Sequence, residues 1–89
     1  ITMKLIIAIV RDADTDSISH ALTAADLRVT QVASTGGFLR RGNTTLLIGL
    51  EDEQTPHALE IIRTNLGPAE PNTHRATIFV VNVDQYVHF

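Results

Sequence analysis

The sequence predicts a small α+β domain in which strands and helices alternate. Four apolar runs rich in β-branched residues predict strands, two segments with apolar residues at helical spacing predict helices, and their order is strand, helix, strand, strand, helix, strand. Two halves of this kind most often form a ferredoxin-like βαββαβ sandwich, with antiparallel strands and both helices on one sheet face. With 89 residues, of which 44% are hydrophobic, we expect a single domain over residues 1–89.

The first half of the chain supplies a strand, a helix and a second strand. Residues 5–10 form a continuous apolar run whose composition favours a strand buried on both faces. Residues 14–17 offer several helix N-caps, and an apolar stripe at i, i+3, i+4 and i+7 follows them. The members of this stripe are Ile18, Ala21, Leu22 and Ala25. Residues 27–34 predict the second strand, although their alternation is imperfect.

The second half repeats the pattern from a third strand at residues 44–50. Thr55 is a predicted N-cap followed by Pro56 at the first helical position, where a missing N–H costs nothing. The buried stripe of this helix consists of Ala58, Leu59, Ile62 and Leu66. The pair Gly67-Pro68 ends the helix, and residues 76–83 predict the fourth strand. Because both helices lie on one side of the sheet, the other apolar face needs a cover, and further copies of the chain are the simplest one.

A glycine-framed segment between the second and third strands, residues 34–45, is the candidate functional stretch. It holds three of the chain's five glycines. The apolar pair Phe38-Leu39 lies where a solvent-facing turn is normally polar, so it needs a ligand, a neighbouring subunit or the body of the domain as its cover. Residues 37–44 come close to the phosphate-loop pattern G-x-x-x-x-G-K-[ST], but Asn43 replaces the lysine and a strand follows instead of a helix. A nucleotide-hydrolysing loop is therefore disfavoured.

Two residue types here suit a nucleotide without hydrolysing it. Asn43 carries a donor and an acceptor on one planar amide, which matches the edge of a purine. The alternative is an asparagine in left-handed conformation that closes the hairpin after Gly42, and chemistry alone leaves both open. Arg28 begins a strand and can meet phosphate oxygens, whereas the adjacent pair Arg40-Arg41 is more simply a solvated loop charge.

Composition excludes several other classes of function. The net charge of −3 argues against a nucleic-acid polymer as partner, and the longest apolar run is too short to span a membrane. The absence of cysteine excludes thiolate metal sites and fits a cytoplasmic protein. Histidines are scattered without ligand spacing, and no Ser/His/Asp arrangement is visible, so we expect neither a metal, a cofactor nor catalysis.

Longer segments of the chain resemble the PII-like cyclic-di-AMP receptor proteins. The specific match is T-G-G-F-L-R-R-G-N-T-T at residues 35–45, and it is supported by residues 3–10, by 76–81 with Val83-Asp84, and by the closing Phe89. The resemblance covers nearly the whole chain. It implies a ferredoxin-like subunit of a PII-type homotrimer that binds cyclic-di-AMP in the clefts between subunits. Such proteins transduce a signal to a protein target through loop movement and have no catalytic activity.

The same resemblance implies a set of ligand-binding residues. Thr30, Asn43 and the backbone at Gly49 fall where the family holds an adenine, and Arg28 falls beside the nucleotide. The remaining implied contacts are Gly37, Phe38 and Leu39 along the ligand, Phe79 from the fourth strand, and His88 near the C-terminus.

The chain departs from the family pattern at three places. The connection between the second helix and the fourth strand, residues 68–75, is shorter than usual, Asp26 stands where the family has Asn, and His88 stands where it has Gln.

The main alternative is a PII-type or ACT-type regulatory trimer that binds ATP or another metabolite and acts through a protein partner. Acyl-phosphate hydrolysis also occurs on this fold, but the glycine-rich arginine loop that it needs after the first strand is replaced by residues 11–14.

Overall fold

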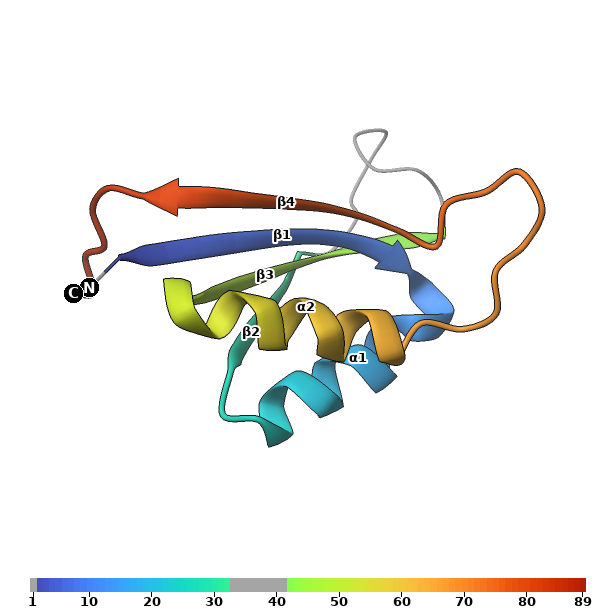
Figure 1. Ribbon diagram of the computed structural model, residues 1–89, viewed down its shortest axis with the longest axis horizontal. Helices are drawn as coiled ribbons and strands as arrows, with labels where there is room; N and C mark the ends of the chain where they lie inside the picture. The colour runs from blue at the N-terminus through green and yellow to red at the C-terminus, as the bar shows by residue number, and fades with distance from the viewer. Residues whose placement is uncertain (1, 33–41) are drawn as a thin grey trace.

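A computed structural model describes residues 2–32 and 42–89 of the chain. Its elements are β1 (Met3–Arg11), α1 (Asp12–Ala24), β2 (Arg28–Val32), β3 (Asn43–Glu51), a 3-10 turn (Asp52–Gln54), α2 (Thr55–Thr64) and β4 (Ala76–Val83). The strands form one antiparallel sheet in the order β2-β3-β1-β4, and both helices lie on the same side of it (Figure 1). The predicted ferredoxin-like α+β fold is confirmed.

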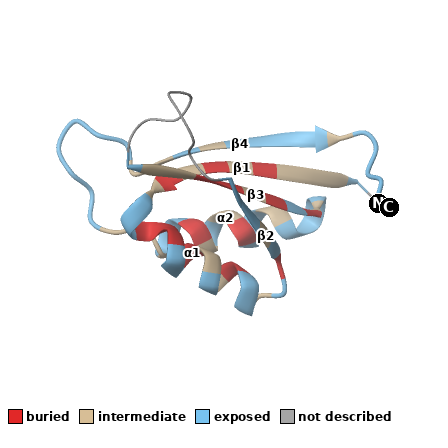
Figure 2. Ribbon diagram, turned by 180° about the vertical axis from the view of Figure 1, so that it is seen from behind, coloured by how far each residue is buried: buried red, intermediate tan, exposed pale blue. Residues whose placement is uncertain are grey.

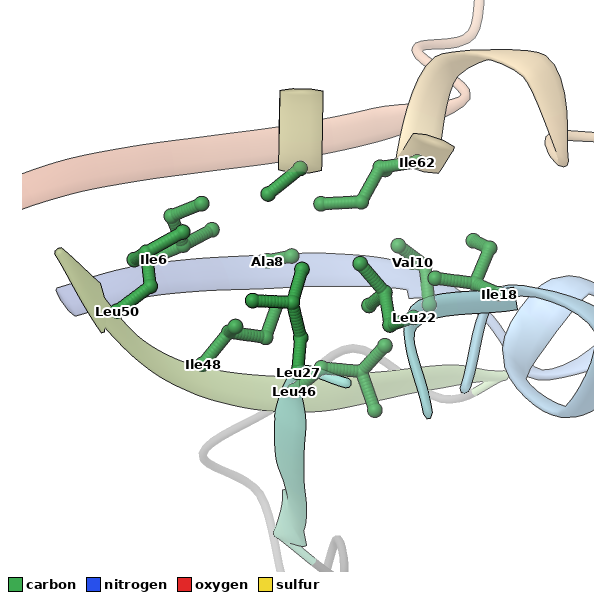
Figure 3. Packing of buried hydrophobic residues seen from close by; sticks show 11 residues of the cluster. Ile6, Ala8, Val10, Ile18, Leu22, Leu27, Leu46, Ile48, Leu50 and Ile62 are labelled. Atoms are coloured by element: carbon green, nitrogen blue, oxygen red, sulfur yellow. The ribbon is translucent and has the colours of Figure 1, made fainter. Parts of the chain in front are cut away.

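The core lies between the sheet and the two helices. Its buried hydrophobic residues are at most 6% exposed, and Figure 3 shows their side chains converging from both layers. The members are Ile6, Ala8 and Val10 of β1, Ile18 and Leu22 of α1, Leu27 just before β2, Leu46, Ile48 and Leu50 of β3, and Ala58 and Ile62 of α2. They are aliphatic throughout, as the near absence of aromatic residues requires.

The prediction that the first strand is buried on both faces is wrong for the single chain. Burial alternates along β1, with Ile6, Ala8 and Val10 buried and the intervening residues only half-buried. Successive side chains of a strand point to opposite faces, and the helices cover only one of them. Figure 2 shows the result, since the buried residues gather on the helix side and the edge strands β2 and β4 are mostly exposed.

Both helices differ from their predicted limits at the ends. α1 begins at Asp12, directly after β1, and Arg11 at its N-cap makes no side-chain capping bond. Acidic residues at the first turn favour this start through the helix dipole, so the predicted caps at 14–17 lie inside the helix. α2 begins at Thr55, so the N-cap is Gln54 and not Thr55 as predicted, and the helix ends at Thr64, before the Gly67-Pro68 stop. None of the helices in the described residues has the length and hydropathy that crossing a bilayer needs.

We predict that Ile6→Ala destabilises the protein by about 2–5 kcal/mol, because a fully buried side chain leaves a cavity between β1 and the helices. Val87→Ala, at an exposed apolar position after β4, is the matched control and should change stability by less than about 0.5 kcal/mol. Urea unfolding at one fixed protein concentration measures both. An equal cost for the two variants would contradict the assignment of Ile6 to the core.

Candidate functional site

The sheet face without helices is largely apolar. The strand register places Leu5, Ile7 and Ile9 of β1 beside Leu47 of β3 and beside Phe79 and Val81 of β4 on this open face. Phe79 is 53% exposed, and Val81 and Val32 are also exposed. A contiguous apolar surface of this kind on a small domain marks an interaction site. The open face is therefore where a partner or a ligand is expected.

The predicted site residues of the described strands all lie on the open face. In the β2–β3 pairing, Arg28 is opposite Gly49 and Thr30 is opposite Leu47. In the β1–β4 pairing, Phe79 is opposite Ile7. Alternation along β3 places Asn43 on the same face as Gly49. Residues from three separate parts of the sequence thus share one surface.

The fold brings only some of these residues close together. Arg28, Thr30 and Gly49 form one cluster, but Asn43 lies six residues from Gly49 along β3. At about 3.4 Å per residue, this separation is about 20 Å, more than one purine can bridge. Phe79 is on the opposite edge of the sheet from β2, and three strand spacings amount to about 14 Å. Within residues 2–32 and 42–89, the predicted site residues therefore lie in three separate places on the open face.

Gly49 contributes room rather than backbone hydrogen bonds. It is paired with Leu5 on one side and with Arg28 on the other, so its N–H and C=O point along the sheet toward neighbouring strands. A Cβ atom built at Gly49 would meet nothing within 4 Å, so packing within the chain does not require glycine there. The missing side chain leaves bare backbone beside Arg28, on which a flat group can lie.

The side chain of Arg28 suits the binding of an anion. Arg28 is exposed, and its guanidinium makes no hydrogen bond or ion pair with another residue in the parts of the chain that the structure describes. By contrast, Lys4 pairs with Asp52 at 3.7 Å and Arg11 pairs with Asp14 at 3.0 Å. A planar cation without a partner among the described residues suits the binding of phosphate oxygens.

The start of β3 settles the conformation of Asn43. The positive φ of 88° belongs to Gly42, and Asn43 is already the first residue of the strand. The alternative in which Asn43 itself closes the hairpin in left-handed conformation is therefore wrong. Asn43 is flanked by two bonds to α1, because Asp12 N donates to Gly42 O at 2.8 Å and Thr44 Oγ1 donates to Asp12 Oδ1 at 2.5 Å.

The remaining predicted contacts stay predictions. Gly37, Phe38 and Leu39 lie outside the described residues. His88 is exposed in the segment after β4, with its ring centroid 6.2 Å from that of Tyr86. Both chain ends lie at the same end of the sheet (Figure 1), which is also the end where Leu5 pairs with Gly49. His88 thus lies at the same end of the sheet as Gly49 and not at the Asn43 end.

Other titratable groups in the described residues do not add a reaction centre. Within residues 2–32 and 42–89, no three His, Cys, Asp or Glu side chains are grouped so that they could hold a metal ion. On α2, the hydrogen bonds from Arg63 lower the pKa of Glu60 and the same contact raises the pKa of Arg63. Both groups are solvent-exposed.

Sequence reasoning missed the residues between the contact points. Leu47 and Ile7 lie directly between Thr30 and Phe79 across the sheet. The apolar alternation of the sequence marked both residues as parts of strands. The pairing register that places them beside Thr30 exists only in the folded sheet.

Two comparisons with known proteins agree with this fold. A family model described as cyclic-di-AMP receptor matches residues 3–74. Among solved structures, the crystal structure of a functionally unknown protein from Pediococcus pentosaceus ATCC 25745 is similar, with 38% sequence identity and a TM-score of 0.79. That match covers 99% of this chain and 98% of the other, so it runs through every described element.

Adjacent threonines at the start of β3 provide a test of the site's polar contacts. Thr45 is 8% exposed and its Oγ1 has no hydrogen-bond partner among the described residues, whereas Thr44 donates to Asp12. We predict that Thr44→Val costs about 1 kcal/mol of stability, while Thr45→Val is neutral or stabilising by up to about 1 kcal/mol. Urea midpoints of both variants measure this difference. An equal loss in Thr45→Val would mean that its hydroxyl has a partner after all.

Proposed function

The chain belongs to the cyclic-di-AMP receptor family, and from this membership we propose a specific mode of action. In this proposal it is a non-enzymatic signal-transduction receptor that binds cyclic-di-AMP in clefts between the subunits of a homotrimer and relays binding to a protein target through loop movement. The observation that carries the proposal is the open face, on which Arg28, Thr30 and Gly49 form a polar cluster beside an apolar surface.

The chemistry of the cluster suits a phosphate-linked adenine. The hydroxyl of Thr30 can donate to and accept from a purine edge, and the bare backbone at Gly49 lets the flat base approach the sheet. Arg28 lies opposite Gly49 and supplies a guanidinium fork for a phosphate. The amide of Asn43 reads the edge of a base at the other end of β3. We therefore assign Arg28, Thr30 and Gly49 to one end of the dinucleotide and Asn43 to another.

The division of contacts between two sheet edges supports a site made by two subunits. The polar cluster lies at the β2–β3 edge and Phe79 at the β4 edge, on opposite sides of the apolar middle of the open face. When the β2 edge of one subunit lies beside the β4 edge of the next, Phe79 reaches the same ligand as Arg28. Such a head-to-tail contact forms a ring when the rotation between subunits closes, and the smallest ring of this kind is a trimer. Association also covers the apolar residues that the helices leave exposed.

A regulatory trimer that binds ATP is the second candidate, because an adenine cluster beside one arginine also fits a mononucleotide. The two candidates differ at Asn43. Cyclic-di-AMP carries a second adenine that can reach toward the Asn43 end, whereas ATP has only one base. Competition between the two nucleotides therefore separates these candidates.

We predict that titration calorimetry detects cyclic-di-AMP binding to the wild-type protein and that Gly49→Ala weakens binding by about tenfold or more, which is about 1.4 kcal/mol. The added methyl group occupies the surface on which the base lies, yet it meets nothing within 4 Å inside the chain, so thermal stability without ligand should stay equal or rise slightly. Excess ATP should not displace the dinucleotide. No heat of binding at ligand concentrations far above micromolar, or displacement by equimolar ATP, would reject the proposal.

A double-mutant cycle tests the assignment to separate ends of the ligand. Thr30 is opposite Leu47, which is four residues from Asn43 along β3, a separation of about 14 Å. Because distant sites act independently, we predict that the losses of binding free energy in Thr30→Val and Asn43→Ala add within about 0.5 kcal/mol in the double variant. A coupling energy above about 1 kcal/mol would instead place both side chains on one base, contributed by different subunits.

A further inference from the structure

We propose that residues 11–14, the β1–α1 junction, couple the Asn43 end of β3 to the connection between α2 and β4. This inference rests on the proposed function, because it assigns a route by which a ligand contact at Asn43 reaches another part of the molecule. The residues of the junction are positioning residues and do not themselves touch the ligand.

One half of the coupling element joins the junction to β3. Arg11 is the strand partner of Asn43, so the two backbones are in register at the end of the sheet. The next residue, Asp12, bonds to both neighbours of Asn43, through its N–H to Gly42 and through its carboxylate to Thr44. A change in the position of Asn43 is therefore passed directly to the first turn of α1.

The other half joins the junction to the chain that follows α2. Asp14 Oδ1 accepts from the Gly67 N–H at 3.0 Å, and Arg11 Nη1 donates to Pro68 O at 3.0 Å. Arg11 Nε also donates to Asp14 Oδ2 at 3.0 Å, which closes the network. A Cβ atom at Gly67 would lie 2.9 Å from Asp14 Oδ1, so the backbone there is pressed against the carboxylate. The position of Gly67 thus depends on Asp14.

The burial of Asp14 makes this network sensitive to small movements. Asp14 is only 7% exposed, and a buried carboxylate is tolerated when its partners stay in place. Arg11 Nη2 lies 3.0 Å from Asp14 Oδ2 but does not form a hydrogen bond with any described residue, so this buried donor is incompletely satisfied. Partly satisfied polar networks are costly, and packed elements shift between discrete arrangements rather than deform continuously.

Arg11 and Asp12 are consecutive residues, and therefore the two halves move together. When the ligand holds Asn43, the bonds of Asp12 to Gly42 and Thr44 persist, and Arg11 remains in place to hold Pro68. Residues 67–75 then open less often. Without the ligand, the end of β3 fluctuates and the same bonds to Gly67 and Pro68 are released more frequently.

Hydrogen–deuterium exchange of the full chain, with and without saturating cyclic-di-AMP, tests the coupling. In the wild-type protein we expect the ligand to slow exchange over residues 67–75 by about threefold or more. In Arg11→Gln, which loses the contacts to Asp14 and Pro68, calorimetric affinity should change by less than about threefold while the slowing at 67–75 disappears. Arg11→Lys keeps the positive charge, so it should restore part of the ligand-dependent slowing of exchange at residues 67–75.

The matched control is Arg63→Gln. Arg63 also pairs with an acid three residues away, Glu60, but on the exposed surface of α2. This variant should retain the wild-type response at residues 67–75. If Arg11→Gln fails to fold, Gly67→Ala replaces it, because the added methyl group pushes the backbone away from Asp14.

The outcomes separate the two proposals. If cyclic-di-AMP binds but exchange at residues 67–75 does not change, the coupling is overturned and the receptor function remains intact. The same holds if Arg11→Gln shows the wild-type slowing of exchange at these residues. Absence of cyclic-di-AMP binding to the wild-type protein would overturn both.

Discussion

The constraint on which this structure depends is that its central strands are apolar on both faces while the helices cover only one. β1 and β3 direct Ile6, Ala8, Leu46 and Ile48 into the core and Leu5, Ile7 and Leu47 onto the open face. Burial of the first set stabilises the fold at about 25 cal/mol per Å² of apolar surface, and the same free energy is available to whatever covers the second set. Folding of the single chain therefore leaves the apolar residues of the open face uncovered by helices, and association can bury them.

The open face combines this apolar surface with a few polar positions. Arg28 and Thr30 come from an edge strand, and Gly49 lies beside them on β3 without a side chain. Glycine in a strand interior normally weakens the strand, and packing within the described residues does not require it here, which agrees with the proposal that a ligand approaches the backbone at Gly49. In the proposed receptor, the same face serves assembly through its middle and ligand contact through its edges.

The far end of the open face is tied into the helix layer by the β1–α1 junction. Strand and helix follow each other without a linker at Arg11–Asp12, so the charged side chains of this junction serve both the sheet and the chain after α2. Buried polar networks are costly when partly satisfied, and they therefore respond to small shifts more sharply than aliphatic packing does. The junction thus connects the sheet to the chain after α2 through polar contacts, whereas the core connects the sheet to the helices through aliphatic packing.

Local patterns in the sequence were sufficient for the element order and for the fold. The predicted limits of β4 match the observed ones, because a β-branched run bounded by polar residues has few alternatives. The helix stripes were also identifiable, although α1 begins earlier than its capping pattern indicated. Residue chemistry and the family resemblance together pointed to Arg28, Thr30, Asn43, Gly49 and Phe79, and their common face follows from period-2 alternation once the register is known.

Only the tertiary structure decided which of these residues are neighbours. The strand order β2-β3-β1-β4 places Arg28 against Gly49 and moves Phe79 to the opposite edge, and the length of β3 separates Asn43 from both. It likewise brings Asp14 to Gly67 across more than fifty residues of chain. Alternation and spacing act over a few residues, so the sequence by itself determined the elements and their faces. Strand pairing and helix docking join distant segments, and they determined the distances between contacts.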